Sequence, residues 1–145
     1  MNPIHVKLLR TGAKLPTYGS AAAAGADLYA CLEETVTIQP GDTFWVPTGI
    51  ALEVPTGCAG LIYARSSMGA KRGLAPANKV GVIDSDYRGE VRVVLLNHSN
   101  QPQTVAPGER IAQLIITPVF TPAYEQADEL TDTDRGTGGF GSTGK

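Results

Sequence analysis

The last eleven residues of the chain combine groups that bind phosphate with a ring that can stack on a base. The segment from Arg135 to Lys145 holds five glycines, Phe140, and the hydroxyls of Ser142 and Thr143. Backbone N–H groups, hydroxyls and a guanidinium bind phosphate oxygens, and an aromatic ring can cover a flat base. Because the segment has too little apolar surface to order itself, we expect an arm that orders on a polyphosphate ligand. A frayed, solvated glycine tail is the alternative.

The segment from Gly81 to Gly89, with the sequence GVIDSDYRG, has the greatest density of reactive groups. Asp84 and Asp86 are two residues apart on a predicted hairpin tip, and Tyr87 follows them. An aspartate next to apolar residues is a candidate general base, because it can hold and deprotonate a water molecule. An Asp-rich turn that only joins two strands is the alternative.

A cation and two hydroxyls occur where a predicted strand meets a predicted short helix. Arg65, Ser66 and Ser67 lie in the segment ARSSMG. A helix N-terminus attracts anions, and arginine adds a fork of donors that fits phosphate. The segment therefore indicates a phosphate site, and a serine cap beside a surface arginine is the alternative.

Two further segments carry weaker signals for a site. Asp27 lies in AGADL, between a glycine and a predicted strand, where an Asx-type turn is the alternative. Gln113 lies in GERIAQ, at the start of the last long strand, and could offer an amide donor to a phosphate. Glu109 and Arg110 of that segment fit a structural ion pair as well as they fit ligand contacts.

Glycine and proline, at 17 and 10 residues, divide the chain into short segments. Runs of β-branched residues between Pro/Gly turns predict an all-β sandwich or barrel. Strands are expected at 36–38, 44–46, 50–54, 61–63, 79–83, 90–97 and 111–120. Only 66–72 predicts a helix, of one or two turns, with serine caps and a basic end. Continuous apolar runs at 93–96 and 114–116 predict burial on both faces, and hence a subunit interface.

Length and composition limit the class of protein. A chain of 145 residues is long enough for a core of its own, and an acidic, polar stretch follows Pro122. We therefore expect a β domain over 1–124, followed by a linker and a C-terminal arm over 125–145. The net charge of −2 does not favour a binder of nucleic acid or membranes. No apolar run approaches the roughly 20 residues of a membrane helix.

Cysteine and histidine usage points to no disulfide framework and no zinc site. Cys31 and Cys58 stand alone in the sequence and are expected to be reduced thiols. His5 and His98 are too scattered to suggest a histidine-centred metal site. The N-terminal residues lack an apolar stretch of the signal-peptide type, so we expect a cytoplasmic protein.

Five segments occur in order between Ala24 and Gly144, namely AGADL, ARSSMG, GVIDSDYRG, GERIAQ and RGTGGFGSTG. Together they resemble the five motifs of the homotrimeric deoxyuridine triphosphate nucleotidohydrolases, or dUTPases. The resemblance implies a jelly-roll subunit in a homotrimer, with active sites shared between subunits and closed by the C-terminal arms. It implies Mg²⁺-assisted hydrolysis of dUTP to dUMP and pyrophosphate, which lowers dUTP and supplies dUMP for thymidylate synthesis. Met68 stands where relatives often carry leucine, which does not affect the chemistry.

The resemblance also assigns roles to residues of the five motifs. Asp84 would activate the water that attacks the α-phosphorus, and Asp27 would hold a water of the Mg²⁺ shell. Tyr87 would pack under the deoxyribose and block a 2′-hydroxyl. The uracil would be bound by the hairpin and covered by the arm through Asn78, Gly81, Val82, Ile83 and Phe140. The phosphates would be bound by Arg65, Ser66, Ser67 and Gln113, and at the γ-phosphate end by Arg135, Gly141, Ser142 and Thr143.

Two other classes of function remain open. A deoxycytidine triphosphate deaminase shares the fold, but it would need a glutamate base for attack on the cytosine ring. Asp84 in that hairpin, Tyr87 and the stacking arm favour the hydrolase. A nucleotide-sensing or partner-binding trimer would keep the same cradle without chemistry, and the intact Asp84 and Arg135 argue against it.

Overall fold

The computed structural model describes residues 3–140 and contains twelve short strands and one short helix in that range. This confirms the all-β prediction. The helix α1 spans Ser66–Arg72. The strands are β1 (Val6–Leu8), β2 (Thr17–Tyr18), β3 (Ala26–Tyr29), β4 (Val36–Ile38), β5 (Thr43–Pro47), β6 (Ile50–Leu52), β7 (Cys58–Tyr63), β8 (Leu74–Pro76), β9 (Gly81–Ile83), β10 (Arg92–Asn97), β11 (Gln103–Val105) and β12 (Arg110–Pro118).

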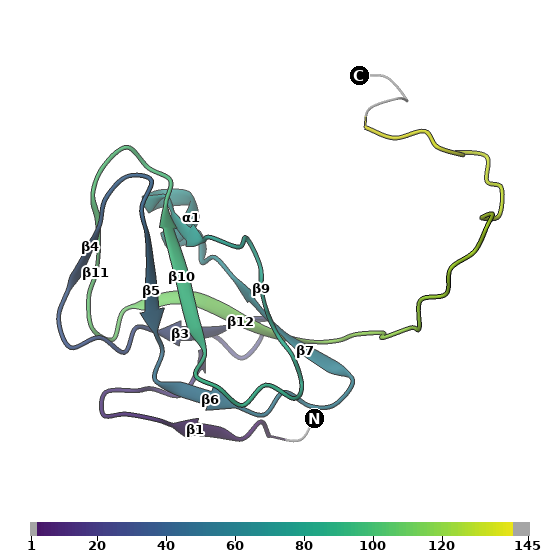
Figure 1. Cartoon of the computed structure of the whole chain (residues 1–145). Coiled ribbons are helices and arrows are strands. Elements are labelled where there is room, and N and C mark those ends of the chain that lie inside the picture. The colour runs from purple at the N-terminus through teal and green to yellow at the C-terminus, as the bar shows by residue number, and fades with distance from the viewer. Residues whose placement is uncertain (1–2, 141–145) are drawn as a thin grey trace.

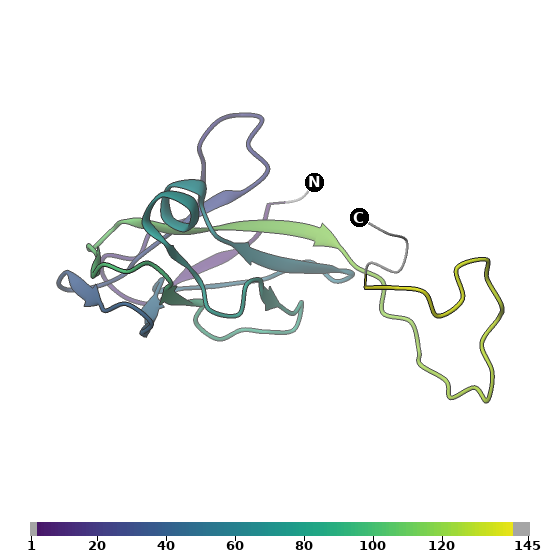
Figure 2. The same ribbon diagram turned by 90° about the horizontal axis from the view of Figure 1, so that it is seen from above.

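The strands form antiparallel sheets that enclose one core (Figures 1 and 2). The larger sheet has the strand order β2-β3-β12-β7-β9, and a second sheet has the order β5-β10-β8. The pairs β1-β6 and β11-β4 complete the fold. Both of the larger sheets contribute to one cluster of buried side chains, including Leu28, Ile62 and Leu114 from the first sheet and Val46, Leu74 and Leu95 from the second.

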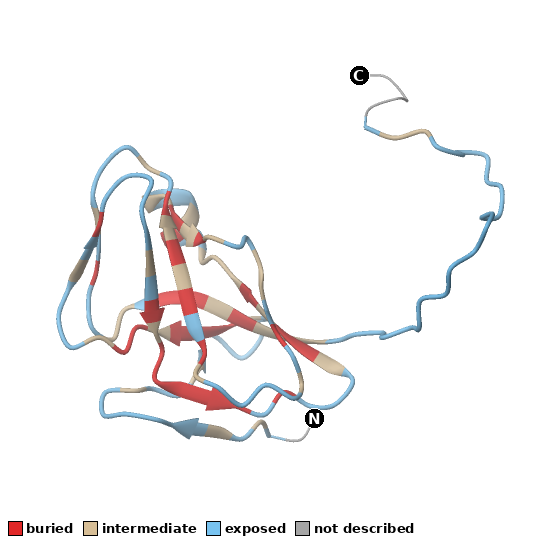
Figure 3. Cartoon of the chain, viewed as in Figure 1, coloured by how far each residue is buried: buried red, intermediate tan, exposed pale blue. Residues whose placement is uncertain are grey.

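The strand β10 alternates between buried and half-exposed side chains. Val93 and Leu95 are buried in the core, whereas Val94 and Leu96 point away from it and are half-exposed. The expected burial of this run on both faces is therefore not met within one chain. Val94 lies opposite Trp45 of β5, and Trp45 is 64% exposed. The outer face of this sheet thus carries apolar side chains that one chain leaves uncovered. Figure 3 shows the alternation of buried and less buried residues along β10.

The helix α1 forms where it was predicted, but its first residue is not capped by a serine. Arg65 occupies the N-cap position with an extended backbone, and its side chain makes no capping hydrogen bond. The helix ends at Gly73, which has a φ of 71° and donates its N–H to the carbonyl of Met68. A Cβ at Gly73 would lie 2.7 Å from the Cβ of Ser99, so both the backbone and the packing require glycine there.

The chain leaves the body of the fold after β12 (Figures 1 and 2). No strand or helix is present between 119 and 140. Phe120, Tyr124 and Leu130 in this segment are almost fully exposed. Large apolar side chains exposed on a segment without strand partners are typical of a surface that contacts another molecule. The boundary between 124 and 125 stays a prediction.

Two other sequence inferences concern the chain as a whole. Cys31 is buried and Cys58 half-buried, and both are free thiols, as predicted. Within residues 3–140, no helix is both long enough and apolar enough to span a membrane.

Candidate functional site

A pocket of about 520 Å³ lies beside β9 and the turn that follows it. Its lining includes six of the predicted site residues, Asn78, Gly81, Val82, Ile83, Asp84 and Tyr87. Ile83 is buried while Val82 and Asp84 are exposed, so the strand alternates between the core and the pocket side. The structure therefore brings the candidate base, the tyrosine and the hairpin backbone to one cavity.

The turn between β9 and β10 is braced by its own hydrogen bonds. The Tyr87 N–H donates to the carbonyl of Asp84 at 3.2 Å. The Arg88 guanidinium donates to the carbonyls of Ser85 and Tyr87, both at 2.9 Å. The Tyr87 hydroxyl donates to the carbonyl of Glu90 at 3.0 Å. These contacts fix the turn although most of its residues are exposed.

The same turn does not close a hairpin, which corrects the sequence prediction. β9 pairs with β7 in the larger sheet, whereas β10 pairs with β5 and β8 in the other sheet. Residues 84–90 therefore cross from one sheet to the other. Sequence pattern alone shows two strands separated by a turn and does not show which strands pair. The crossing leaves room beside the turn, and the pocket lies there.

A second pocket, of about 440 Å³, collects the predicted phosphate-binding groups. Arg65, Ser66, Ser67, Gln113 and Asp27 line it. Gln113 lies opposite both Asp27 of β3 and Tyr63 of β7, because β12 runs between these two strands. Sheet pairing thus assembles into one pocket three segments that are far apart in the sequence.

Asp27 lies within β3 rather than in an Asx-type turn, and two arginines bind its carboxylate. It is only 8% exposed. The Arg65 Nε donates to Oδ1 at 2.7 Å, and the Arg110 Nη1 donates to Oδ2 at 3.1 Å. Arg65 also donates through Nη1 to the hydroxyl of Ser67 at 3.1 Å. The carboxylate therefore orients the guanidinium of Arg65 beside the serine hydroxyls.

Arg110 reaches Asp27 because the pairing of β12 with β3 is irregular. The register shifts between Arg110 and Ala112, so Ile111 has no partner on β3. In a regular strand, residues three apart point to opposite faces, so Arg110 could not lie on the same face as Gln113. Gln113 is the partner of Asp27 on β3, so the register shift is what brings Arg110 to Asp27. Arg110 pairs with Asp27 and Glu109 pairs with Arg72, so these two neighbours do not form the ion pair suggested by the sequence.

Gln113 is held by a hydrogen bond and by a close approach to a glycine. Its Nε2 donates to the carbonyl of Ala64 at 2.8 Å. A Cβ at Gly25 would lie 2.7 Å from the Gln113 Oε1, so a larger residue there would displace the amide. An amide nitrogen carries two hydrogens, and the second one remains for a ligand in the pocket that Gln113 lines.

The donor set fits a cation that arrives on a ligand better than one held by the protein. Among residues 3–140, no cluster of three or more His, Cys, Asp or Glu side chains could hold a metal ion. Asp27 is the single carboxylate in the second pocket, and both of its oxygens accept from arginines. Mg²⁺ usually keeps several waters and binds through substrate phosphates, so one protein carboxylate near the phosphates is enough for it.

Two described residues of the C-terminal arm, Arg135 and Phe140, line neither of the two pockets. Phe140 is fully exposed, and within the described residues Arg135 donates through Nε to the carbonyl of Gly138 at 2.8 Å. The predicted ligands Gly141, Ser142 and Thr143 lie outside the described residues. One chain therefore separates the predicted site into three parts.

Among the lining residues that sequence reasoning did not single out, four carry an aromatic ring or a charge. Trp45, Glu90 and Arg92 line the first pocket, and Lys71 lines the second. Lys71 follows Ser67 by four residues in a predicted helix, and this spacing was a readable signal for a shared face. Trp45 had no such signal, because it reaches the pocket only through the pairing of β5 with β10.

The comparisons with known proteins agree on one family over nearly the whole chain. Residues 11–144 match the family model dUTPase. The deoxyuridine 5'-triphosphate nucleotidohydrolase of Desulfitobacterium hafniense (strain DSM 10664 / DCB-2) is 48% identical over 149 residues, covering 99% of each chain. The protein with the same name from Hahella chejuensis is 49% identical over 131 residues, covering 90% of this chain and 86% of the relative.

Solved dUTPase structures share the fold. The dUTPase of Staphylococcus bacteriophage 80alpha with dUPNHPP superposes with a TM-score of 0.90 at 29% identity and full coverage of both chains. A mutant dUTPase from phage phi11 of S. aureus, described for the coordination of a structural Mg(II) ion, gives a TM-score of 0.79 at 25% identity. It covers 88% of this chain and 98% of its own. These matches confirm the jelly-roll expectation, and the chain belongs to the dUTPase family of nucleotidohydrolase enzymes.

Proposed function

We propose that this chain hydrolyses dUTP to dUMP and pyrophosphate, at sites shared between the subunits of a homotrimer. The observation that carries the proposal is the separation of two complementary pockets. One pocket holds the candidate base and a nucleoside-sized cavity, and the other holds cations and hydroxyls for phosphate. The two linings have no residue in common, which supports a complete site that combines groups from more than one chain.

The first pocket would hold deoxyuridine. The backbone of Val82 and Ile83 would bind the uracil edge, with the Asn78 amide beside it. Fixed donors and acceptors reject cytosine, which presents the reversed pattern, and a close fit excludes the 5-methyl group of thymine. Tyr87 would pack under the deoxyribose, where its ring leaves no room for a 2′-hydroxyl.

The second pocket would hold the phosphates of the same nucleotide through a neighbouring chain. Arg65 offers a guanidinium that Asp27 orients, and Lys71 adds a second cation to the lining. The hydroxyls of Ser66 and Ser67 and the Gln113 amide supply neutral donors. Preorganised donors of this kind stabilise the charge that develops during phosphoryl transfer.

Mg²⁺, when bound with the triphosphate, would neutralise phosphate charge and help fix the geometry of the triphosphate. Asp27 would accompany it through a metal-bound water. The two arginines bind both carboxylate oxygens of Asp27 and compete with that water for them, so the first contribution of Asp27 is to orient Arg65.

Asp84 would act as the general base. Its carboxylate is exposed at the lining of the first pocket, where a water molecule can reach it. It accepts a proton as the water oxygen forms a bond to the α-phosphorus. The bond from that phosphorus to the bridging oxygen breaks at the same time, and pyrophosphate leaves with the electron pair. The products are dUMP and pyrophosphate.

Uncovered apolar surface supports the homotrimer. Val94 and Leu96 on the outer face of β10 are half-exposed, and Trp45 lies beside them. Phe120 and Tyr124 are exposed on the segment that leaves the fold. Closed homo-oligomers bury such surfaces between identical chains. The glycine-rich arm that begins at Arg135 would then reach a neighbour's site, with Arg135, Gly141, Ser142 and Thr143 at the γ-phosphate and Phe140 on the uracil.

Product analysis with each deoxynucleoside triphosphate and with UTP tests the proposal. With Mg²⁺ present, we expect pyrophosphate and dUMP from dUTP and little product from the other nucleotides. Release of ammonia from dCTP would instead identify a deaminase. Tight binding of dUTP without any product would identify a nucleotide sensor. A cytoplasmic location remains a prediction of the sequence.

Replacing Tyr87 with alanine is expected to weaken discrimination at the sugar. The ring is assigned as the steric barrier to a 2′-hydroxyl, so its removal should narrow the ratio of kcat/KM for dUTP over UTP. The ratio is the proper measure, because the loss of packing against Tyr87 also lowers kcat/KM for dUTP itself. A ratio that stays unchanged or grows would assign Tyr87 to the fold rather than to substrate selection.

A further inference from the structure

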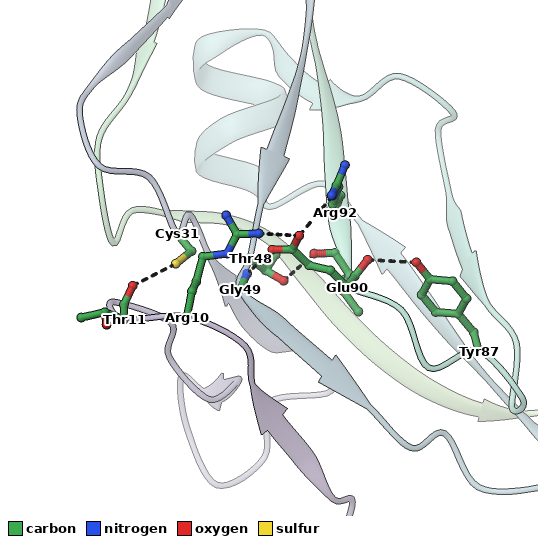
Figure 4. Close-up of polar contacts among 9 residues, drawn as sticks. Arg10, Thr11, Cys31, Thr48, Gly49, Tyr87, Glu90 and Arg92 are labelled. Carbon is green, nitrogen blue, oxygen red and sulfur yellow. Dashed lines mark hydrogen bonds and ion pairs between the residues drawn. The ribbon is translucent and has the colours of Figure 1, made fainter.

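The Glu90 carboxylate is the centre of a network of polar contacts (Figure 4), and Glu90 also lines the first pocket. Its side chain is 9% exposed. Oε2 accepts from Arg10 Nη2 at 2.8 Å and from Arg92 Nε at 3.2 Å. Oε1 accepts from the Gly49 N–H at 2.9 Å. A nearly buried carboxylate with three donors is held in one position.

The backbone to which Glu90 is anchored is itself rigid. Gly49 has a φ of +69°, and a Cβ there would lie 2.8 Å from both the Ala13 Cβ and the Cys31 Sγ. The Leu9 N–H donates to the Gly49 carbonyl at 2.8 Å. The Thr48 hydroxyl donates to the carbonyl of the residue after Glu90. This bend cannot shift without disturbing four segments of the fold, so it serves as a fixed point.

The backbone carbonyl of Glu90 holds the ring of Tyr87. The Tyr87 hydroxyl donates to it at 3.0 Å, and Figure 4 shows the ring extending away from this bond. A Cβ at Gly89 would lie 2.4 Å from the Tyr87 hydroxyl oxygen, so the ring folds back against the peptide between 89 and 90. Tyr87 is 45% exposed, which means that core packing does not fix it.

We propose that Glu90 is a positioning residue for selection of the sugar, and this inference rests on the proposed function. Its carboxylate fixes the backbone of residue 90, and its carbonyl fixes the Tyr87 hydroxyl. The ring then keeps one place in the pocket, where it excludes a 2′-hydroxyl. The Arg10 and Arg92 side chains hold the carboxylate. Glu90 therefore acts through Tyr87.

The variant Glu90→Ala tests this role by the ratio of kcat/KM for dUTP over UTP. We expect that ratio to fall by about tenfold, because an unfixed ring no longer excludes the 2′-hydroxyl. Glu90→Gln should give an intermediate ratio, since its amide oxygen still accepts from Gly49 but forms no ion pair. A purely structural role would lower both values of kcat/KM equally and leave the ratio unchanged, which would overturn the proposal.

Glu109→Ala is the matched control variant. Glu109 also binds an arginine, Arg72, and accepts from a backbone N–H, that of Ala106, at 2.9 Å. It lines neither of the two pockets. We expect it to lower the melting temperature without changing the ratio for the two nucleotides. An equal change of the ratio in Glu109→Ala would show that general destabilisation, and not the position of Tyr87, sets discrimination.

A binding measurement separates this inference from the proposed hydrolysis. Trp45 is the single tryptophan of the chain and lines the same pocket, so its fluorescence reports the binding of dUMP and UMP. Wild-type protein that releases no pyrophosphate from dUTP would contradict the proposed function. A preference for dUMP over UMP that Glu90→Ala reduces would still support the role of Glu90, and an unchanged preference would refute it.

Gly89→Ala keeps the test valid if Glu90→Ala does not fold. The added Cβ would displace the Tyr87 hydroxyl while leaving the Glu90 carboxylate and its three donors in place. We expect the ratio for dUTP over UTP to fall as it does for Glu90→Ala. An unchanged ratio in a folded Gly89→Ala protein would show that the backbone at 89–90 does not position the ring.

Discussion

Replacing Asp84 with asparagine is expected to give a folded trimer that binds dUTP but hydrolyses it about 10²–10⁴-fold more slowly. Asparagine keeps the shape of the side chain but cannot accept a proton from water. Asp84 is exposed and its carboxylate makes no ion pair in the described residues, so the change should cost little stability. Single-turnover hydrolysis and equilibrium binding of dUTP measure the two properties separately.

Asp86→Asn is the control for this variant. Asp86 lies on the same turn and is equally exposed, but it does not line the pocket. Its replacement removes the same charge from the same segment and should leave hydrolysis within a few-fold of wild type. If Asp84→Asn retains activity within about tenfold of wild type, Asp84 is not the base and the mechanism is wrong.

Truncation after Asp134 should abolish most hydrolysis and leave the trimer intact. The described part of the arm has no strand partners, Arg135 bonds to the nearby Gly138 carbonyl, and Phe140 is fully exposed. Its removal should therefore barely change the melting temperature or the mass measured by light scattering. Activity should fall severely, because the truncation removes both the segment that would exclude water from the site and the side chains that would bind the phosphates.

Phe140→Ala gives the graded version of the same experiment. Stacking of a ring on a base is worth about 1–3 kcal/mol, so this variant should lose less activity than the truncated protein. A truncated protein with full activity would show that the tail is a solvated appendage. A truncated protein that dissociates into monomers would show that the tail is structural instead.

Local features of the fold were predictable from sequence. Short β-branched runs between Pro/Gly turns gave correct strands such as 36–38, and the one helical segment formed at 66–72. These features depend on residues close together in the chain. The serine cap was wrong, because an extended Arg65 takes that position and its side chain binds Asp27 instead.

Contacts between distant segments could not be predicted in the same way. Asp27 and Arg110 are 83 residues apart, and their ion pair depends on a register shift in β12 that no local pattern indicates. The anchor of Glu90 at Gly49 likewise depends on segments 41 residues apart. Residue types singled out the candidate site residues, but only the fold shows that those within the described part of the chain divide between two separate pockets.

Mixing two inactive variants tests most directly whether one active site draws on different chains. Asp84→Asn keeps the arm but lacks the base, and the protein truncated after Asp134 keeps the base but lacks the arm. When equal amounts of the two variants are unfolded together and refolded, random trimers should regain hydrolysis of dUTP at about a quarter of their sites. Half of the chains carry Asp84 and the other half carry the arm. Each restored site would take Asp84 from one chain and the arm from another. Mixed trimers that remain as inactive as the separate variants would contradict a shared site.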